Sequence, residues 1–155
     1  MQVSCTPIPV PERSAAHRPC ARSYHAACAI DDQWVVVHGG WTGLKPLSCC
    51  WALNMETFSW IQIKFVGEQP SARQGHSITF FPKARRLFLF GGLDASGAVV
   101  KDKAYFLSVP HDLSERWQWQ PVRLAGLSRT IGGIMVDRAF HSTSDIGNEK
   151  IVVFG

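Results

Sequence analysis

The sequence predicts an all-β protein built from a repeated unit of four antiparallel strands. Three observations support this fold class. A short motif with an arginine, a histidine, an apolar run and a glycine pair recurs along the chain. Charged residues make up only 18% of the 155 residues, which is low for a helical protein. Valine, isoleucine and aromatic residues cluster in short runs between turn residues, as they do in strands.

The repeat is visible in three copies. R-S-Y-H at 22–25 precedes W-V-V-V-H-G-G, R-Q-G-H at 73–76 precedes L-F-L-F-G-G, and R-A-F-H at 138–141 precedes K-I-V-V-F-G. The arginines are 51 and 65 residues apart (73 − 22 and 138 − 73), so the unit has about 50 residues and the second copy is longer.

Each unit is expected to form one sheet of four strands, A to D. Strand A is predicted at 24–30 and 76–81, strand B at 34–38 and 87–90, strand C at 50–54 and 104–108, and strand D at 59–65 and 118–124. Strand B is nearly continuous in apolar residues, which is typical of a strand buried on both faces. One sheet cannot bury both of its faces alone, so sheets of this kind are expected to stack around an axis.

At these positions the sequence resembles the kelch-repeat β-propeller family. The residues that match its glycine doublet after strand B, its aromatic residue on strand C and its tryptophan on strand D are Gly39, Gly40, Gly91, Gly92, Trp51, Tyr105, Trp60 and Trp119. The resemblance implies kelch-type blades of four antiparallel strands. Since two whole units and half of a third are present, it also implies an incomplete propeller fragment.

The repeat gives the expected organisation of the chain. Residues 1–18 form an N-terminal lead, which is either disordered or part of a preceding blade. Residues 19–72 are the first kelch repeat, 73–137 the second, and 138–155 the first half of a third. A chain of this kind is not expected to close into a monomeric ring, because two and a half sheets leave an exposed face and unpaired strand edges.

The repeated arginines have two readings. Arg22, Arg73 and Arg138 start successive A strands near the axis, where they would form a cationic mouth for an acidic segment of a partner protein. In the structural reading they bind backbone carbonyls within the repeats, because buried polar groups need partners. The B-to-C and D-to-A connections are long and share one face, so Trp41 and Lys45 join the arginines as candidate partner-binding residues.

The sequence gives no pattern that predicts a metal site, a catalytic site, or a nucleic-acid or membrane partner. Cys5, Cys20, Cys28, Cys49 and Cys50 have no zinc-site spacing, so neither metal nor cofactor is predicted, and a cytoplasmic or nuclear location is expected. Serine and histidine neighbours at 76–77 and 141–142 would point to opposite faces of a strand, which predicts no catalytic site. The net charge of +4 is scattered, and no apolar run is long enough to span a membrane, so neither nucleic acid nor a membrane is an expected partner.

The sequence therefore predicts a kelch-repeat protein–protein interaction module, an adaptor, effector or scaffold, rather than an enzyme. The binding surface would be the loops on one propeller face. The alternative is a fragment of a propeller enzyme that acts on a small molecule or carbohydrate, in which the missing blades hold the chemistry.

Overall fold

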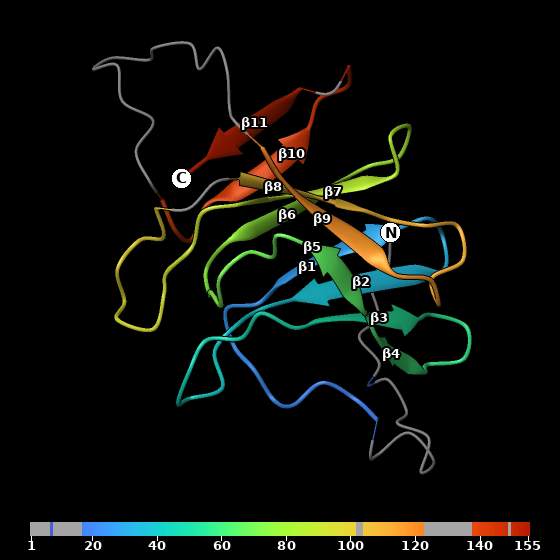
Figure 1. Cartoon of the computed structure of the whole chain (residues 1–155), viewed down its shortest axis with the longest axis horizontal. Helices are drawn as coiled ribbons and strands as arrows, with labels where there is room; N and C mark the ends of the chain where they lie inside the picture. The colour runs from blue at the N-terminus through green and yellow to red at the C-terminus, as the bar shows by residue number, and fades with distance from the viewer. Residues whose placement is uncertain (1–6, 8–16, 102–103, 123–137, 149) are drawn as a thin grey trace.

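The structure is a computed structural model that describes residues 7, 17–101, 104–122, 138–148 and 150–155. The described residues contain strands and turns and no helix. The predicted N-terminal lead and the second D-to-A loop at 123–137 lie almost wholly outside these residues. The strands form three sheets in chain order, and the second sheet lies between the other two (Figure 1).

The first sheet has four antiparallel strands in the order β1-β2-β3-β4. They are β1 (Ala26–Ile30), β2 (Trp34–His38), β3 (Cys50–Asn54) and β4 (Trp60–Gln62). All five residues of β3 are buried, as are the last three of β2, because a neighbouring strand and a neighbouring sheet cover them. The predicted B and C strands of this repeat coincide with β2 and β3. Strand A begins two residues later than predicted.

The second sheet contains β6 (Ser77–Phe81), β7 (Arg86–Phe90), β8 (Ala104–Ser108) and β9 (Trp117–Val122). A fifth strand, β5 (Phe65–Gly67), pairs in parallel with β9 at the outer edge. The sequence predicted one D strand at 59–65, and this is wrong. The chain leaves the first sheet after β4 and crosses to the second sheet before the repeat ends.

Gly67 explains how β5 can lie against β9. It has a φ of +87°, and a Cβ on this residue would collide with the backbone carbonyl oxygen of Trp119. The amide of Trp117 donates to the carbonyl of Lys64 at 2.9 Å, which fixes the start of the crossing segment. The outer edges of the first two sheets are therefore joined by backbone pairing as well as by side-chain packing.

The third sheet is a hairpin of β10 (Ser142–Asp145) and β11 (Ile151–Phe154). The innermost strands of the three sheets are β1, β6 and β10, and β6 contacts both of the others. Figure 1 shows this side-by-side arrangement of the inner strands, with the loops at 41–47 and 93–101 extending beyond the sheets. The antiparallel blades expected from the repeat are thus present, and they stack in chain order.

The main hydrophobic core fills the space between the first two sheets. It joins Ala26 and Ile30 of β1 to Ile78 and Phe80 of β6. The repeat tryptophan Trp119 is 2% exposed, and its ring centroid lies 5.5 Å from that of His38 in the first sheet and 6.1 Å from that of Tyr105 in its own sheet. The other repeat aromatics also pack, with Trp51 buried and Trp60 half-buried. These side chains hold neighbouring sheets together.

Candidate functional site

The three repeated arginines make the same contact in each repeat. Nη1 of Arg22 donates to the carbonyl of Gly39 at 3.0 Å, and Nη1 of Arg73 donates to that of Gly91 at 3.1 Å. Nη1 of Arg138 donates to the carbonyl of Gly155 at 3.0 Å. Each guanidinium therefore links the segment that precedes the first strand of its repeat to the glycine that follows the second strand. This contact accounts for the 17- or 18-residue spacing between arginine and glycine.

The arginines differ in how far they reach solvent. Arg73 is 0% exposed, and its guanidinium also donates to the carbonyl and the hydroxyl of Ser71 at 3.0 and 3.1 Å. It lies 5.8 Å from the centre of the Tyr105 ring. Additional protein around the chain can only increase this burial, so Arg73 is placed to hold the fold rather than to contact a partner. Arg22 and Arg138 are half-buried.

Arg22 and Trp41 line one open pocket of about 380 Å³, with Ser23, Thr42 and Gly43 beside them. Two backbone hydrogen bonds join Ser23 and Trp41, at 2.8 and 3.0 Å, and fix the width of the pocket. The hydroxyl of Thr42 accepts from the amide of Lys45 at 3.2 Å, which folds the loop into a tight turn. Lys45 is exposed. The structure thus places Trp41 and Lys45 on the connection between β2 and β3, and it brings Arg22, from the segment before β1, next to Trp41.

Two exposed aromatic residues near this pocket were missed by the sequence reasoning. Tyr24 and Phe140 occupy the same position of their repeats as Gly75 and are 58% and 61% exposed. All three have a left-handed backbone, with φ of 53°, 58° and 63°. The amide of Gly75 donates to the carbonyl of Tyr24, and that of Phe140 to the carbonyl of Gly75. The glycine in the middle copy was the sequence signal for this backbone.

The rings of Tyr24 and Phe140 contact each other next to Gly75. Their centroids are 5.5 Å apart at an interplanar angle of 77°, an edge-to-face contact. A bulky residue with positive φ is strained by about 1–2 kcal/mol relative to glycine. Exposed aromatic side chains at such strained positions are more typical of a recognition surface than of a packing device.

The glycine doublets create room for the neighbouring repeat. Gly39 and Gly91 have φ of +63° and +67°, and a Cβ on either would lie 2.7 Å from the Cε1 atom of a histidine in the next repeat, His76 or His141. The amide of Gly40 donates to the carbonyl of Arg73 at 2.9 Å. The doublets are therefore contact points between blades, and no helix N-terminus follows them as a phosphate loop would need.

His38 and His76 form a buried pair at the first blade junction. Nδ1 of His38 lies 2.9 Å from Nε2 of His76, and the residues are 1% and 5% exposed. Burial and the nearby charges of Arg73 and Arg22 lower the pKa of His38 to about 3, and burial with the same Arg73 lowers the pKa of His76. Both rings are therefore neutral at pH 7.

A serine–histidine pair unforeseen from the sequence lies at the second blade junction. The hydroxyl of Ser77 lies 2.9 Å from Nε2 of His141, and both residues are buried. Nδ1 of His141 has no hydrogen-bond partner among the described residues, so no group orients the ring as in a catalytic triad. This pair joins two strands rather than facing a substrate pocket.

Metal and thiol chemistry adds no site in the described part of the chain. Among the described residues, no three histidine, cysteine, aspartate or glutamate side chains are grouped so that they could hold a metal ion. The thiols of Cys20 and Cys49 lie 3.5 and 3.4 Å from the guanidinium of Arg22, and burial raises the pKa of the Cys28 and Cys50 thiols. No helix in the described part of the chain is long and apolar enough to cross a membrane.

A family model described as the KLHDC2/KLHL20/DRC7 Kelch-repeats domain matches residues 7–155. The chain belongs to the kelch-repeat family. The kelch resemblance seen in the glycine doublets and aromatic positions, and the fold class that it implied, are thereby confirmed. Kelch repeats are in general protein-interaction modules and are typically not enzymes.

Several characterised proteins are similar to the chain. The flagellar outer-arm dynein alpha chain of Chlamydomonas reinhardtii is 31% identical over 111 residues, which are 72% of this chain and 2% of that protein. Multiple epidermal growth factor-like domains protein 8 of Homo sapiens is 30% identical over 149 residues, 94% of this chain and 5% of that protein. The Rab9 effector protein with kelch motifs of Xenopus laevis is 32% identical over 81 residues, 50% of this chain and 22% of that protein. The chain thus spans only a small part of these relatives.

Proposed function

We infer that this kelch chain binds an acidic segment of a partner protein through the face that carries Arg22, Trp41 and Lys45. The observation that carries the proposal is the open pocket between Arg22 and Trp41, beside an exposed lysine on the same loop. A half-buried guanidinium that is already oriented by Gly39 loses little entropy when it binds a carboxylate. Arg138 lies at the corresponding place in the third repeat and extends the positive charge.

The exposed aromatic pair supports the same face. Tyr24 and Phe140 directly precede the A-strand histidines, at the same end of the sheets as Arg22 and Arg138. Aromatic side chains beside arginines are the usual anchors of protein interfaces. The Rab9 effector is a relative whose name states a protein partner. Arg73, which the sequence reasoning included, is left out because it is fully buried.

The test is a charge reversal on each face of the full-length protein. Lys45→Glu and Arg138→Glu, singly and together, are measured against a partner recovered with the wild-type protein. We expect the double variant to weaken binding by well over tenfold, about the loss for desolvated charge pairs. Arg116→Glu in the C-to-D turn on the opposite side is the matched control, because Arg116 is also exposed. Circular dichroism checks that each variant is folded.

Normal binding by the folded Lys45→Glu, Arg138→Glu double variant, together with loss of binding by Arg116→Glu, would place the partner on the other face. Arg85→Glu is unsuitable as a control. The guanidinium of Arg85 binds Asp31 with two hydrogen bonds of 3.0 and 3.1 Å, so its reversal would disturb the contact between the first two repeats.

A further inference from the structure

The two junctions between inner strands are built from different side chains. At the first junction, Ala26 and Ile30 of β1 and Ile78 and Phe80 of β6 belong to one apolar core. At the second junction the inner strands are joined by polar contacts, beside a smaller apolar cluster in which Ile151 of β11 packs against Phe81 and Phe88. Ser77 bonds His141, and the hydroxyl of Thr79 lies 2.6 Å from that of Thr143. Between the inner strands, the first junction is therefore closed mainly by apolar packing and the second mainly by hydrogen bonds.

The polar junction is open at the end that carries the A-to-B turns. Side chains two residues apart on a strand share a face, so Phe81 follows Thr79 and Asp145 follows Thr143 into the second junction. Ser77 pairs with Phe90 in the second repeat as Ser142 pairs with Phe154 in the third, so equivalent residues of β6 and β10 are 65 positions apart (142 − 77). Asp145 is therefore the counterpart of the core residue Phe80 (80 + 65). A carboxylate stands where the first junction has an aromatic ring.

A pocket results from this exchange. Phe81, Pro82 and Ala84 form its apolar wall, and Asp145 and Gly147 form the facing wall, around a volume of about 310 Å³. The amide of Gly147 donates to Oδ1 of Asp145 at 2.8 Å and so orients the carboxylate. Lys83 lies at the rim with an exposed side chain. The pocket lies on the opposite side of the sheets from Arg22 and Trp41.

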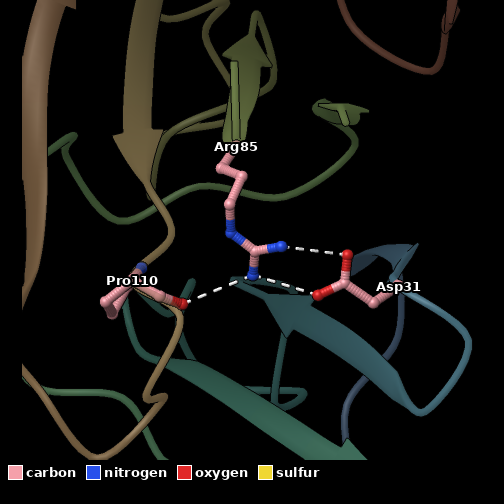
Figure 2. Close-up of polar contacts among 3 residues, drawn as sticks. All are labelled: Asp31, Arg85 and Pro110. Atoms are coloured by element: carbon pink, nitrogen blue, oxygen red, sulfur yellow. Dashed lines mark hydrogen bonds and ion pairs between the residues drawn. The ribbon is translucent and has the colours of Figure 1, made fainter. Parts of the chain in front are cut away.

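The first junction has an arginine bound to a carboxylate at the same end of the blades. Figure 2 shows the guanidinium of Arg85, from the A-to-B turn of the second repeat, bound to both carboxylate oxygens of Asp31 and to the carbonyl of Pro110. An arginine of the chain itself thus links neighbouring turns at this end of the blades. Its stem covers apolar surface while its head pairs with a carboxylate.

We propose that the pocket between Phe81 and Asp145 binds an arginine side chain from a basic segment of a partner protein. The guanidinium pairs with the Asp145 carboxylate, and the stem packs on Phe81, Pro82 and Ala84. A neutral or acidic occupant would remove Asp145 from water without a counter-ion, which costs free energy. A cationic side chain with an apolar stem can pair with Asp145 on one wall and pack against the apolar residues of the other. Lys83 opposes this binding weakly, because its charge is exposed and screened.

The test uses the full-length protein labelled with 15N-phenylalanine and two blocked tripeptides, acetyl-Gly-Arg-Gly-amide and its citrulline analogue. Citrulline keeps the shape of arginine without the charge. The Phe81 amide signal is assigned by its loss in a Phe81→Leu variant. We expect the arginine peptide to shift the Phe81 signal saturably and the citrulline peptide to bind about tenfold more weakly.

Three variants separate the contributions. Asp145→Asn should weaken the arginine peptide about tenfold, and Lys83→Gln should strengthen it about twofold. Asp32→Asn, which changes an exposed carboxylate in the turn between β1 and β2, should leave it unchanged. The absence of a saturable Phe81 shift, equal binding of the citrulline peptide, an unaffected Asp145→Asn variant, or weaker binding by Lys83→Gln would each overturn the proposal. None of these outcomes bears on the Lys45 and Arg138 test of the other face.

Discussion

At the scale of single residues, equivalent positions of the repeat have the same contact but different exposure. Arg22 and Arg73 both bind a glycine carbonyl across their repeat, yet Arg73 is completely buried and Arg22 is not. The sequence motif therefore indicates the contact, whereas the surroundings decide whether a residue can also serve in binding.

The first prediction follows from this difference. Arg73→Lys should lower the free energy of unfolding by about 3 kcal/mol, because an ammonium cannot replace the guanidinium hydrogen bonds to Gly91 and Ser71 in a buried place. Arg22→Lys should cost about 1 kcal/mol. Urea denaturation of both variants measures the two losses, and equal losses would contradict the buried role of Arg73.

The second prediction concerns pH. The pKa of His38 and of His76 is lower in the folded protein than the ordinary value near 6.5, so the unfolded chain binds more protons at acidic pH. The stability that the neutral histidines contribute is therefore fully present above pH 6.5. It is lost as the pH falls from 6.5 toward the folded pKa, which is about 3 for His38. Each histidine contributes a slope of up to about 1.4 kcal/mol per pH unit.

Urea denaturation between pH 7.5 and 5 tests this slope. His76→Gln should make the dependence shallower, whereas His111→Gln, which changes an exposed histidine, should leave it as it is. An unchanged slope in His76→Gln would show that the buried pair does not carry the effect.

At the scale of strands, regular apolar runs were predictable and the crossing strand was not. Strands β2, β3 and β8 lie where the sequence placed them, because their apolar runs end at glycine or polar turn residues. The D strand of the first repeat was predicted too long at 59–65, since local sequence does not show that 65–67 pair with the next sheet. That pairing depends on β9, about 50 residues later in the chain.

The third prediction tests the crossing strand. Gly67→Ala would place a methyl group against the carbonyl of Trp119, so β5 should detach from β9 and the protein should lose about 3 kcal/mol or more. Gly43→Ala is a matched control with a similar φ of +93° and no atom within 4 Å of the added carbon, and it should cost about 1 kcal/mol. Urea denaturation measures both losses of stability. Equal losses would contradict the claim that Gly67 is required by its close contact with the Trp119 carbonyl.

The candidate site was predictable in part for the same reason. Local motifs and strand parity put Arg22 beside the connection that carries Trp41 and Lys45, and in the structure Arg22 and Trp41 line one pocket. Tyr24 and Phe140 were missed because no local pattern reveals that rings 116 residues apart (140 − 24) touch across Gly75. The pocket at Asp145 was missed because it depends on which residue faces β6 from another sheet.

At the scale of the whole molecule, the sheets stack in order and leave apolar side chains at the surface of the third. Phe154 is 80% exposed and Val152 is 46% exposed on β11, and Phe140 is 61% exposed nearby. Apolar residues on an uncovered sheet promote association with other sheets.

The fourth prediction is that the 155-residue chain self-associates when it is produced alone. Sedimentation velocity over a range of concentrations should show species larger than a monomer, and the combined changes Val152→Thr and Phe154→Ser should reduce them. A monodisperse wild-type monomer at all concentrations would contradict this.

The central claim, that a partner binds the face that carries Arg22, Trp41 and Lys45, is tested most directly by hydrogen–deuterium exchange of the full-length protein with and without its partner. We expect slower exchange on binding in the segments 22–25 and 41–47, and no change in the A-to-B turns at 31–33 and 82–85. Protection of those turns with none at 22–25 or 41–47 would contradict the claim.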